Sequence, residues 1–458
     1  MNPTRTYRLA TSQGQIPAVV ALLFFLLTAG ALGALLIAGL FFPEWRFSMR
    51  EVSLFGRREW LLLAGLAGPL LFAAYYAQGA ILTGSSIRAE RMTILHLLLH
   101  GAGVAWLLLG VLMQPLPGIA PAAVLLPGYG LLLCGLVLPW LNGLLTASVR
   151  NRWDAPSLMV LTALFWLGLS GLYAFGSMLE IFGWSLDFAM DRAALLRLHG
   201  LLALAGGIWL GLLGVSLLSL QLFNVSEKAA GLLSTLGYWL MNIALLLAVP
   251  VVLGAHSILY SWLGGLFLLG SALVVVDAVR ILLAGRATFL REPYGWVLLL
   301  ALVAGLLLWT CVLRTVITPD LIAAANLMSD GSGFSVWLAL VILLLVFYPV
   351  VIKTVPFLVW RIRCLPLMLD YNQPGTREMV DKRSSWITVL LLLLGSFYLG
   401  AGSRLSDPAI IQLGLLSLLV AGVWMLHALW PAIAVFVLGI TPHNKEKSAI
   451  TANIDPDQ

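Results

Sequence analysis

Long apolar runs, separated by short polar loops, are the feature that most constrains this chain. A helix that crosses a bilayer needs about 20 consecutive apolar residues. Twelve such runs follow one another, at residues 17–42, 59–83, 92–114, 122–147, 157–182, 194–223, 230–254, 257–284, 294–317, 336–360, 385–403 and 409–440. The sequence therefore predicts an all-α, polytopic transmembrane bundle of about 12 helices.

The composition supports this prediction because it excludes a soluble protein. Only 10% of the 458 residues are charged, whereas a soluble domain carries about 25%. The net charge of +6 does not indicate nucleic acid, since the basic residues lie in loops between apolar runs. The three cysteines, Cys134, Cys311 and Cys364, stand too far apart in sequence to indicate a disulfide framework or a thiolate metal site.

The distribution of Lys and Arg predicts the topology. With twelve spans, one side of the membrane carries 18 of the 26 basic residues. The other side carries 8, namely Arg46, Arg50, Arg57, Arg58, Arg192, Arg197, Arg314 and Arg404. Because the side richer in Lys and Arg faces the cytoplasm, we expect both termini there. The predicted parts are a cytoplasmic N-tail (1–16), a single transmembrane domain (17–440) with a cytoplasmic loop (361–384), and a cytoplasmic C-tail (441–458).

Two histidines in the third predicted span are the first candidates for chemistry. Ionisable side chains are costly inside a membrane and often mark functional sites there. His96 and His100 are four residues apart, which places both imidazoles on one helix face, where they could ligate one metal ion. The alternative is that both imidazoles hydrogen-bond to polar groups of neighbouring helices.

Two further histidines could join a cofactor site. His199 opens the sixth predicted span near the non-cytoplasmic face, and His427 is expected in the middle of the last span. At a rise of about 1.5 Å per residue, His100 and His199 differ by roughly 10 Å in membrane depth. This separation disfavours one shared metal ion but leaves room for a haem. Alternatively, the glycines that follow His199, Gly207 and Gly211, serve simple helix packing.

A third group of polar residues could line a transport path. Lys353 lies between Pro349 and Pro356, where prolines free backbone carbonyls, or it extends to the nearby cytoplasmic face. Gln78 and Tyr76 of the second span complete this candidate pathway. Asp277 and Arg280, three residues apart, are expected to form a local ion pair.

Three stretches together resemble bacterial polytopic proteins related to the haem–copper oxidase catalytic subunit and the NnrS family. The first runs from His199 through Gly206 and Gly214-Val215-Ser216 to Phe223. The second is Lys353-Thr354-Val355-Pro356-Phe357-Leu358-Val359-Trp360. The third runs from His96 through Gly110 to Gln114-Pro115-Leu116-Pro117. The resemblance implies an oxidase-subunit-I-like bundle in the bacterial inner membrane, with haem or copper held by His199, His96, His100 and His427.

Departures from the family pattern limit that implication. The oxidase uses six histidines for two haems and a copper ion, and this chain has 6 in total, of which His443 lies in the C-tail. Ala203 stands where the family has a tyrosine, and Arg361-Ile362-Arg363 follow Trp360 where it has a histidine. We therefore expect no oxygen-reducing centre and, by this reasoning, no enzyme activity.

Three readings of the function remain from the sequence. The first is a membrane protein that binds one haem or one copper ion through intramembrane histidines. The second is a non-catalytic subunit or scaffold that assembles with other membrane subunits. The third is a permease for a small molecule. All three predict the lipid bilayer as the immediate partner.

Overall fold

The computed structural model describes most of the helical part of the chain. The described residues are 20, 69, 72, 75–76, 90–113, 121–147, 154–181, 192–223, 230–254, 257–284, 293–317, 348, 351–353, 355–360, 378–405 and 407–438. The predicted span 17–42, most of spans 59–83 and 336–360, both tails, most of the loop 361–384 and the candidate Gln78 lie outside them.

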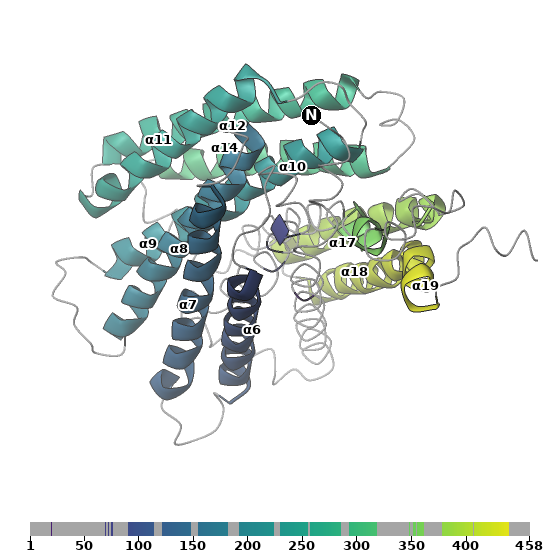
Figure 1. Cartoon of the computed structure of the whole chain (residues 1–458), viewed down its shortest axis with the longest axis horizontal. Coiled ribbons are helices and arrows are strands. Elements are labelled where there is room, and N and C mark those ends of the chain that lie inside the picture. The colour runs from purple at the N-terminus through teal and green to yellow at the C-terminus, as the bar shows by residue number, and fades with distance from the viewer. Residues whose placement is uncertain are drawn as a thin grey trace, which may run out of the picture. The chain divides into compact units, whose positions relative to one another are not determined.

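Two compact units divide the chain, and each is described by itself. The N-terminal unit contains α6 (Glu90–Met113), α7 (Pro121–Ala147), α8 (Ala155–Ile181), α9 (Arg192–Leu201), the π-helix η2 (Leu202–Trp209), α10 (Leu210–Phe223), α11 (Leu232–Gly254) and α12 (Ser257–Ala284). It also contains residues 301–317 of α14 (Pro293–Ile317). Figure 1 labels the α-helices of this unit.

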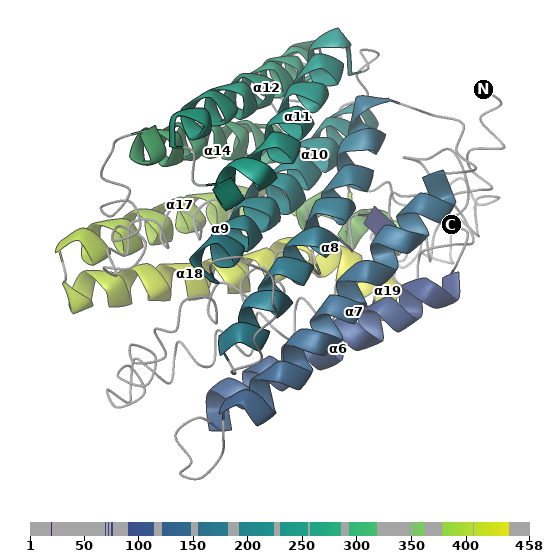
Figure 2. The ribbon, with the colours of Figure 1, turned by 90° about the vertical axis from the view of Figure 1, so that its left-hand side faces the viewer.

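The C-terminal unit contains residues 293–300 of α14, the described part of 348–360, α17 (Lys382–Leu405), α18 (Pro408–Ala428) and α19 (Trp430–Leu438). Consecutive helices pack as pairs in both units. The pairs with the most extensive contact are α6 with α7, α11 with α12, and α17 with α18, and Figure 2 shows them side by side. Helix α8 packs on α7, α9, η2 and α10.

Six of the described helices are apolar and long enough to cross a membrane. These segments are Leu126–Thr146, Ala155–Leu179, Leu198–Leu220, Leu232–Val252, Leu259–Ala284 and Ala409–Ala428. A helix satisfies its backbone hydrogen bonds within itself, which is why apolar sequence can cross lipid in this form. The protein is therefore an integral membrane protein built of helices, and the count of twelve spans stays a prediction.

Helix boundaries agree with the apolar runs wherever the structure describes them. Each of the nine runs from 92–114 to 409–440, apart from 336–360, begins and ends within three residues of a helix or a continuous series of helices. The break predicted at 254–257 is confirmed, because α11 ends at Gly254 and α12 begins at Ser257. Apolar run length thus predicted the helices well.

The sixth predicted span is continuous but not uniformly α-helical. Its residues Leu202–Trp209 form the π-helix η2, a form that widens the turn and often occurs at functional sites. Gly206 and Gly207 of η2 lie against α8, where an added Cβ would come within 2.6 Å of Trp166 and 2.3 Å of Leu167. Of the two glycines singled out after His199, Gly207 therefore serves close helix packing.

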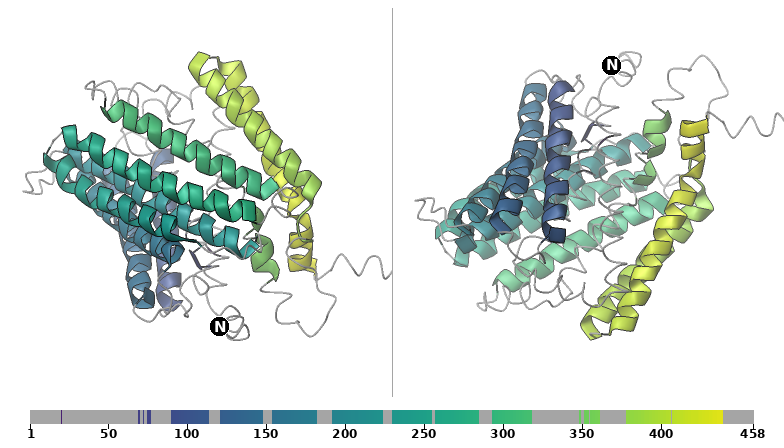
Figure 3. Two further views of the ribbon diagram at one scale, coloured as in Figure 1. Left: turned by 90° about the horizontal axis from the view of Figure 1, so that it is seen from above. Right: turned by 90° about the horizontal axis from the view of Figure 1, so that it is seen from below.

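The last predicted span, 409–440, is not one helix. Helix α18 ends at Ala428 and α19 begins at Trp430, and the axis of α19 turns away from that of α18 (Figure 3). Pro431 explains the break, because proline lacks the N–H that would bond to the carbonyl of His427 and its ring collides with that carbonyl.

Candidate metal centre

The two histidines of α6 lie together in the interior of the N-terminal unit. His96 and His100 are 0% and 1% exposed, and their ring centroids are 5.7 Å apart. Phe72 places its ring edge-on against both imidazoles, at centroid distances of 4.3 Å and 5.3 Å. The predicted juxtaposition of the two imidazoles is thus confirmed, in an apolar environment.

Helix α7 approaches this pair closely because it carries a glycine opposite His100. A Cβ added to Gly135 would lie 3.1 Å from the backbone nitrogen of His100 and 3.3 Å from its Cβ. Leu132, one turn earlier on α7, contacts Gly103 of α6 in the same way. Small residues of this kind let membrane helices pack backbone to backbone, which seals the histidines from the lipid on that side.

Tyr76 fixes the orientation of the first imidazole. Its hydroxyl is hydrogen-bonded to Nδ1 of His96 at 2.6 Å, and the tyrosine is fully buried. The other ring nitrogen, Nε2, is buried and has no hydrogen-bond partner among the described residues. If Nδ1–H donates to the Tyr76 oxygen, Nε2 carries an unused lone pair inside the protein.

Further hydroxyls line the same region. Tyr75 is buried next to Tyr76, with ring centroids 5.2 Å apart. Thr146 of α7 lies near the Tyr75 hydroxyl, although neither hydroxyl oxygen has a hydrogen-bond partner within the described part of the chain. A buried cluster of hydroxyls from Tyr76, Tyr75 and Thr146 therefore adjoins the α6 pair through the Tyr76–His96 hydrogen bond. The sequence pattern indicated neither Phe72 nor Thr146, and it grouped Tyr75 with Tyr76 and Gln78 in the candidate pathway, because nothing in their spacing links these residues to α6.

His199 is held by a different helix and does not join the α6 pair through any contact described. It lies on α9, is 6% exposed, and its Nδ1 lies 3.0 Å from Oγ and 3.1 Å from the carbonyl oxygen of Ser170 on α8. Because the carbonyl can only accept, Nδ1–H donates to it. Helix α9 packs on α8, whereas α6 packs on α7, so these histidines lie on helices that are not neighbours.

His427 does not lie in the middle of a span, and this prediction was wrong. It is the second-last residue of α18 and is exposed, because the helix stops before Pro431. Its Nδ1 lies 2.8 Å from Oγ of Ser384, whose hydroxyl also bonds to the carboxylate of Asp381. The backbone N–H of Asp381 donates to the carbonyl of Ala428 at 2.9 Å. His427 thus belongs to a junction between the end of α18 and the start of α17.

The candidate pathway residues have other partners. The Lys353 ammonium lies 5.0 Å from the centroid of the Tyr294 ring, a cation–π distance, within the C-terminal unit. Tyr76 lies in the N-terminal unit, where its hydroxyl bonds to His96. Neither contact points to a transport path.

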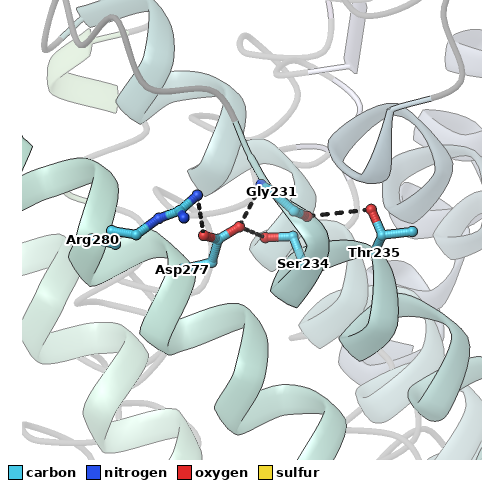
Figure 4. Close-up of polar contacts among 5 residues, drawn as sticks. All are labelled: Gly231, Ser234, Thr235, Asp277 and Arg280. Carbon is cyan, nitrogen blue, oxygen red and sulfur yellow. Dashed lines mark hydrogen bonds and ion pairs between the residues drawn. The ribbon is translucent and has the colours of Figure 1, made fainter.

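The predicted ion pair on α12 is confirmed and is part of a larger cluster (Figure 4). Arg280 contacts Asp277 Oδ1 at 2.9 Å, and Asp277 is fully buried. Its Oδ2 accepts hydrogen bonds from the Gly231 N–H at 2.7 Å and the Ser234 hydroxyl at 2.5 Å. Asp277 therefore caps the N-terminus of α11 from the next helix. Its partners lie more than 40 positions earlier in the sequence, so local sequence cannot reveal this contact.

No group of three or more His, Cys, Asp or Glu side chains within the described ranges could hold a metal ion. A site there would have to use the two α6 histidines together with other ligands. Comparison with known proteins adds nothing to this choice, because no family model and no curated protein matches the chain.

Proposed function

We propose that this integral membrane protein binds one copper ion through His96 and His100, within a haem–copper-oxidase- or NnrS-like bundle. The observation that carries the proposal is the Nε2 atom of His96, which is buried without a hydrogen-bond partner among the described residues. A buried polar nitrogen without a partner costs free energy, and a metal ion would use its lone pair.

The position of Tyr76 supports a ligand role for His96. Histidines that bind metals almost always use their second nitrogen to hydrogen-bond an oxygen, which fixes the tautomer and the ring orientation. The 2.6 Å contact between Tyr76 and Nδ1 of His96 supplies this interaction. The residues present therefore fit the ion that the resemblance implies.

The spacing of the two rings also fits one ion. A ligating nitrogen lies about 2.0–2.1 Å from a metal and about 1.1 Å from its own ring centre, so two rings on one ion have centroids at most about 6.4 Å apart. The observed 5.7 Å meets this requirement. Copper would supply one-electron exchange and the capacity to bind a small diatomic ligand.

The surroundings of the pair favour copper in the cuprous state, because this state carries the lower charge. Among the described residues no Asp or Glu joins the pair in a group that could hold a metal ion, and the rings of Phe72 and Tyr76 contact it. Because desolvation cost grows with the square of the charge, a monovalent ion costs about a quarter as much to bury as a divalent one. Imidazole is also a suitable ligand for copper.

An anaerobic titration of the detergent-purified protein with Cu(I), against a coloured competing chelator, tests the proposal. Wild type should bind one equivalent, and His96→Ala should lose measurable binding. Tyr76→Phe should weaken binding by about 10–100-fold, since only the orienting contact is removed. The matched control is His199→Ala, which removes a buried histidine that Ser170 already holds.

Equal Cu(I) affinity in wild type and His96→Ala, with both proteins monodisperse, would show that His96 is not a ligand. A Soret band that is present in wild type and lost in His96→Ala would show that the same nitrogen binds haem instead of copper. If the Soret band is lost in His199→Ala instead, the haem-binding histidine lies on α9 and not on α6.

A non-catalytic membrane subunit or scaffold is the second candidate. It is favoured by the two other candidate histidines, since His199 is held by Ser170 and His427 by Ser384. Contacts of this kind stabilise helix pairs and require no cofactor. This candidate predicts that neither copper nor haem accompanies the folded protein.

A further inference from the structure

The nine-residue helix α19 follows a helix that already crosses the membrane. Helix α18 has 21 residues, which at 1.5 Å per residue span about 31 Å, close to the roughly 30 Å of a bilayer core. Helix α19 has 9 residues and reaches only about 13 Å. It therefore begins where α18 leaves the hydrocarbon and cannot cross the membrane itself.

One face of α19 packs on other residues of the C-terminal unit, and the opposite face is apolar and exposed. Ala432 and Val435 are buried against Val359 and Met379. Trp430, Phe436 and Val437 are 58%, 37% and 66% exposed. Apolar surface of this extent is unfavourable in water. Since α19 turns away from α18 (Figure 3), its exposed face is available to a surface beside the span.

The neighbouring end of α17 carries positive charge and a second exposed tryptophan. The Asp381–Ala428 hydrogen bond places the start of α17 at the depth where α18 ends. Lys382 and Arg383 of its first turn are exposed, and Trp386, one turn further, is 43% exposed. No ion pair joins either cation to a carboxylate among the described residues. Cations do not stabilise a helix N-terminus, and the Asp381 carboxylate beside them is bound by the Ser384 hydroxyl and by backbone N–H groups, so both cationic side chains are open to an anionic partner outside the chain.

We propose that α19 and the first turn of α17 form an interfacial lipid-binding surface for anionic phospholipid headgroups. Trp430, Phe436 and Val437 lie at the boundary between headgroups and acyl chains, where tryptophan is favoured. Lys382 and Arg383 contact the headgroup phosphates, since cations beside the membrane attract anionic lipid. The C-terminal helix is then parallel to the membrane surface and is not part of a span.

Spin labels on the full chain in nanodiscs of 70% phosphatidylcholine and 30% phosphatidylglycerol test the position of α19. Labels at Val437→Cys and at Leu416→Cys, a lipid-facing reference within α18, are introduced with the three native cysteines replaced by serine. The Val437 label should be more accessible to oxygen than to a water-soluble nickel complex, and shallower than the Leu416 label. Preferential access of the nickel complex would overturn the proposal. Spin–spin broadening that disappears when the labelled protein is diluted with unlabelled protein would also overturn the proposal. Such a result would show that a second copy of the chain covers the exposed face of α19.

Analysis of the lipids that remain with the protein, after exchange into these nanodiscs and purification, tests the role of Lys382 and Arg383. Wild type should retain phosphatidylglycerol at a several-fold excess over its bulk ratio, and Lys382→Gln/Arg383→Gln should retain the bulk ratio. Lys382→Arg/Arg383→Lys, which keeps both charges, is the matched control and should behave as wild type. An unchanged excess in the glutamine variant would contradict the proposal.

Discussion

His96 shows at the scale of one residue what sequence can and cannot reveal. The four-residue spacing to His100 predicted that both imidazoles share a helix face, and their 5.7 Å separation confirms it. The contact that fixes the His96 ring comes from Tyr76, which lies 20 residues earlier. No periodic pattern connects the two, so only the folded structure reveals that the other nitrogen of His96 has no hydrogen-bond partner among the described residues.

Asp381 makes stability depend on pH at the start of α17. The hydrogen bond from the Ser384 hydroxyl is the largest effect on the pKa of this carboxyl and lowers it below its ordinary value of 3.8. Burial, the second-largest effect, opposes this shift, and weaker contributions from the backbone N–H groups of Ser384 and Arg383 and from His427 add to it. A lowered folded-state pKa adds stability above the unfolded pKa, and that stability is lost as the pH falls through the folded value. Between pH 5 and pH 3, the melting temperature of wild type should therefore fall more than that of Asp381→Asn. Parallel melting curves for the two proteins would contradict this assignment.

Apolar run length predicts where the helices of this chain lie, but not how they deviate from ideal geometry. The boundaries agree within three residues, because the length of an apolar run is a local property. The π-helix at Leu202–Trp209 packs against α8, and the length of an apolar run predicts neither feature. The break at Pro431 could have been found, since proline inside an apolar run is a recognised signal.

Glycines at the contact of α11 and α12 should be intolerant of any side chain. A Cβ at Gly237 would lie 2.5 Å from the carbonyl oxygen of Gly270, whereas one at Gly265 meets nothing within 4 Å. We expect Gly237→Ala to destabilise the protein by about 1–3 kcal/mol through overpacking. Gly265→Ala, the control in α12, should be neutral or slightly stabilising. Thermal unfolding in detergent measures both, and equal melting temperatures would refute the close contact.

The Asp277 cap should contribute more to stability than a cap within one helix. Asp277→Ala leaves the Gly231 N–H and the Ser234 hydroxyl without their acceptor and removes the Arg280 contact. The expected loss is about 1–3 kcal/mol. Asp407→Ala removes the N-cap of α18 and should cost about 1 kcal/mol. Thermal unfolding of the two variants in the same detergent provides the comparison, and an Asp277→Ala variant no less stable than Asp407→Ala would contradict the ranking.

At the scale of the whole molecule, sequence predicted the class of protein more firmly than its family. Composition and apolar runs predicted a helical membrane protein, and six described helices are long and apolar enough to cross a membrane. The twelve-span count and the oxidase-like arrangement depend on residues outside the described ranges and on long-range packing. They remain predictions from charge distribution and motif resemblance.

The predicted topology can be tested with reporter fusions on the full chain. Because 18 of the 26 basic residues are assigned to the side that carries both termini, a C-terminal green fluorescent protein should fluoresce and a C-terminal alkaline phosphatase should be inactive. Phosphatase inserted after residue 406, between α17 and α18, should be active. The opposite pattern at either position would reverse the topology or change the number of spans.

Metal content, measured together with an optical spectrum, decides whether the buried nitrogen of His96 binds a metal. Protein purified in mild detergent from copper-supplemented cells should contain one copper ion per chain and show no Soret band. His96→Ala, prepared in the same way, should contain none. A monodisperse wild-type protein with neither copper nor haem would contradict metal binding at His96 and favour the scaffold.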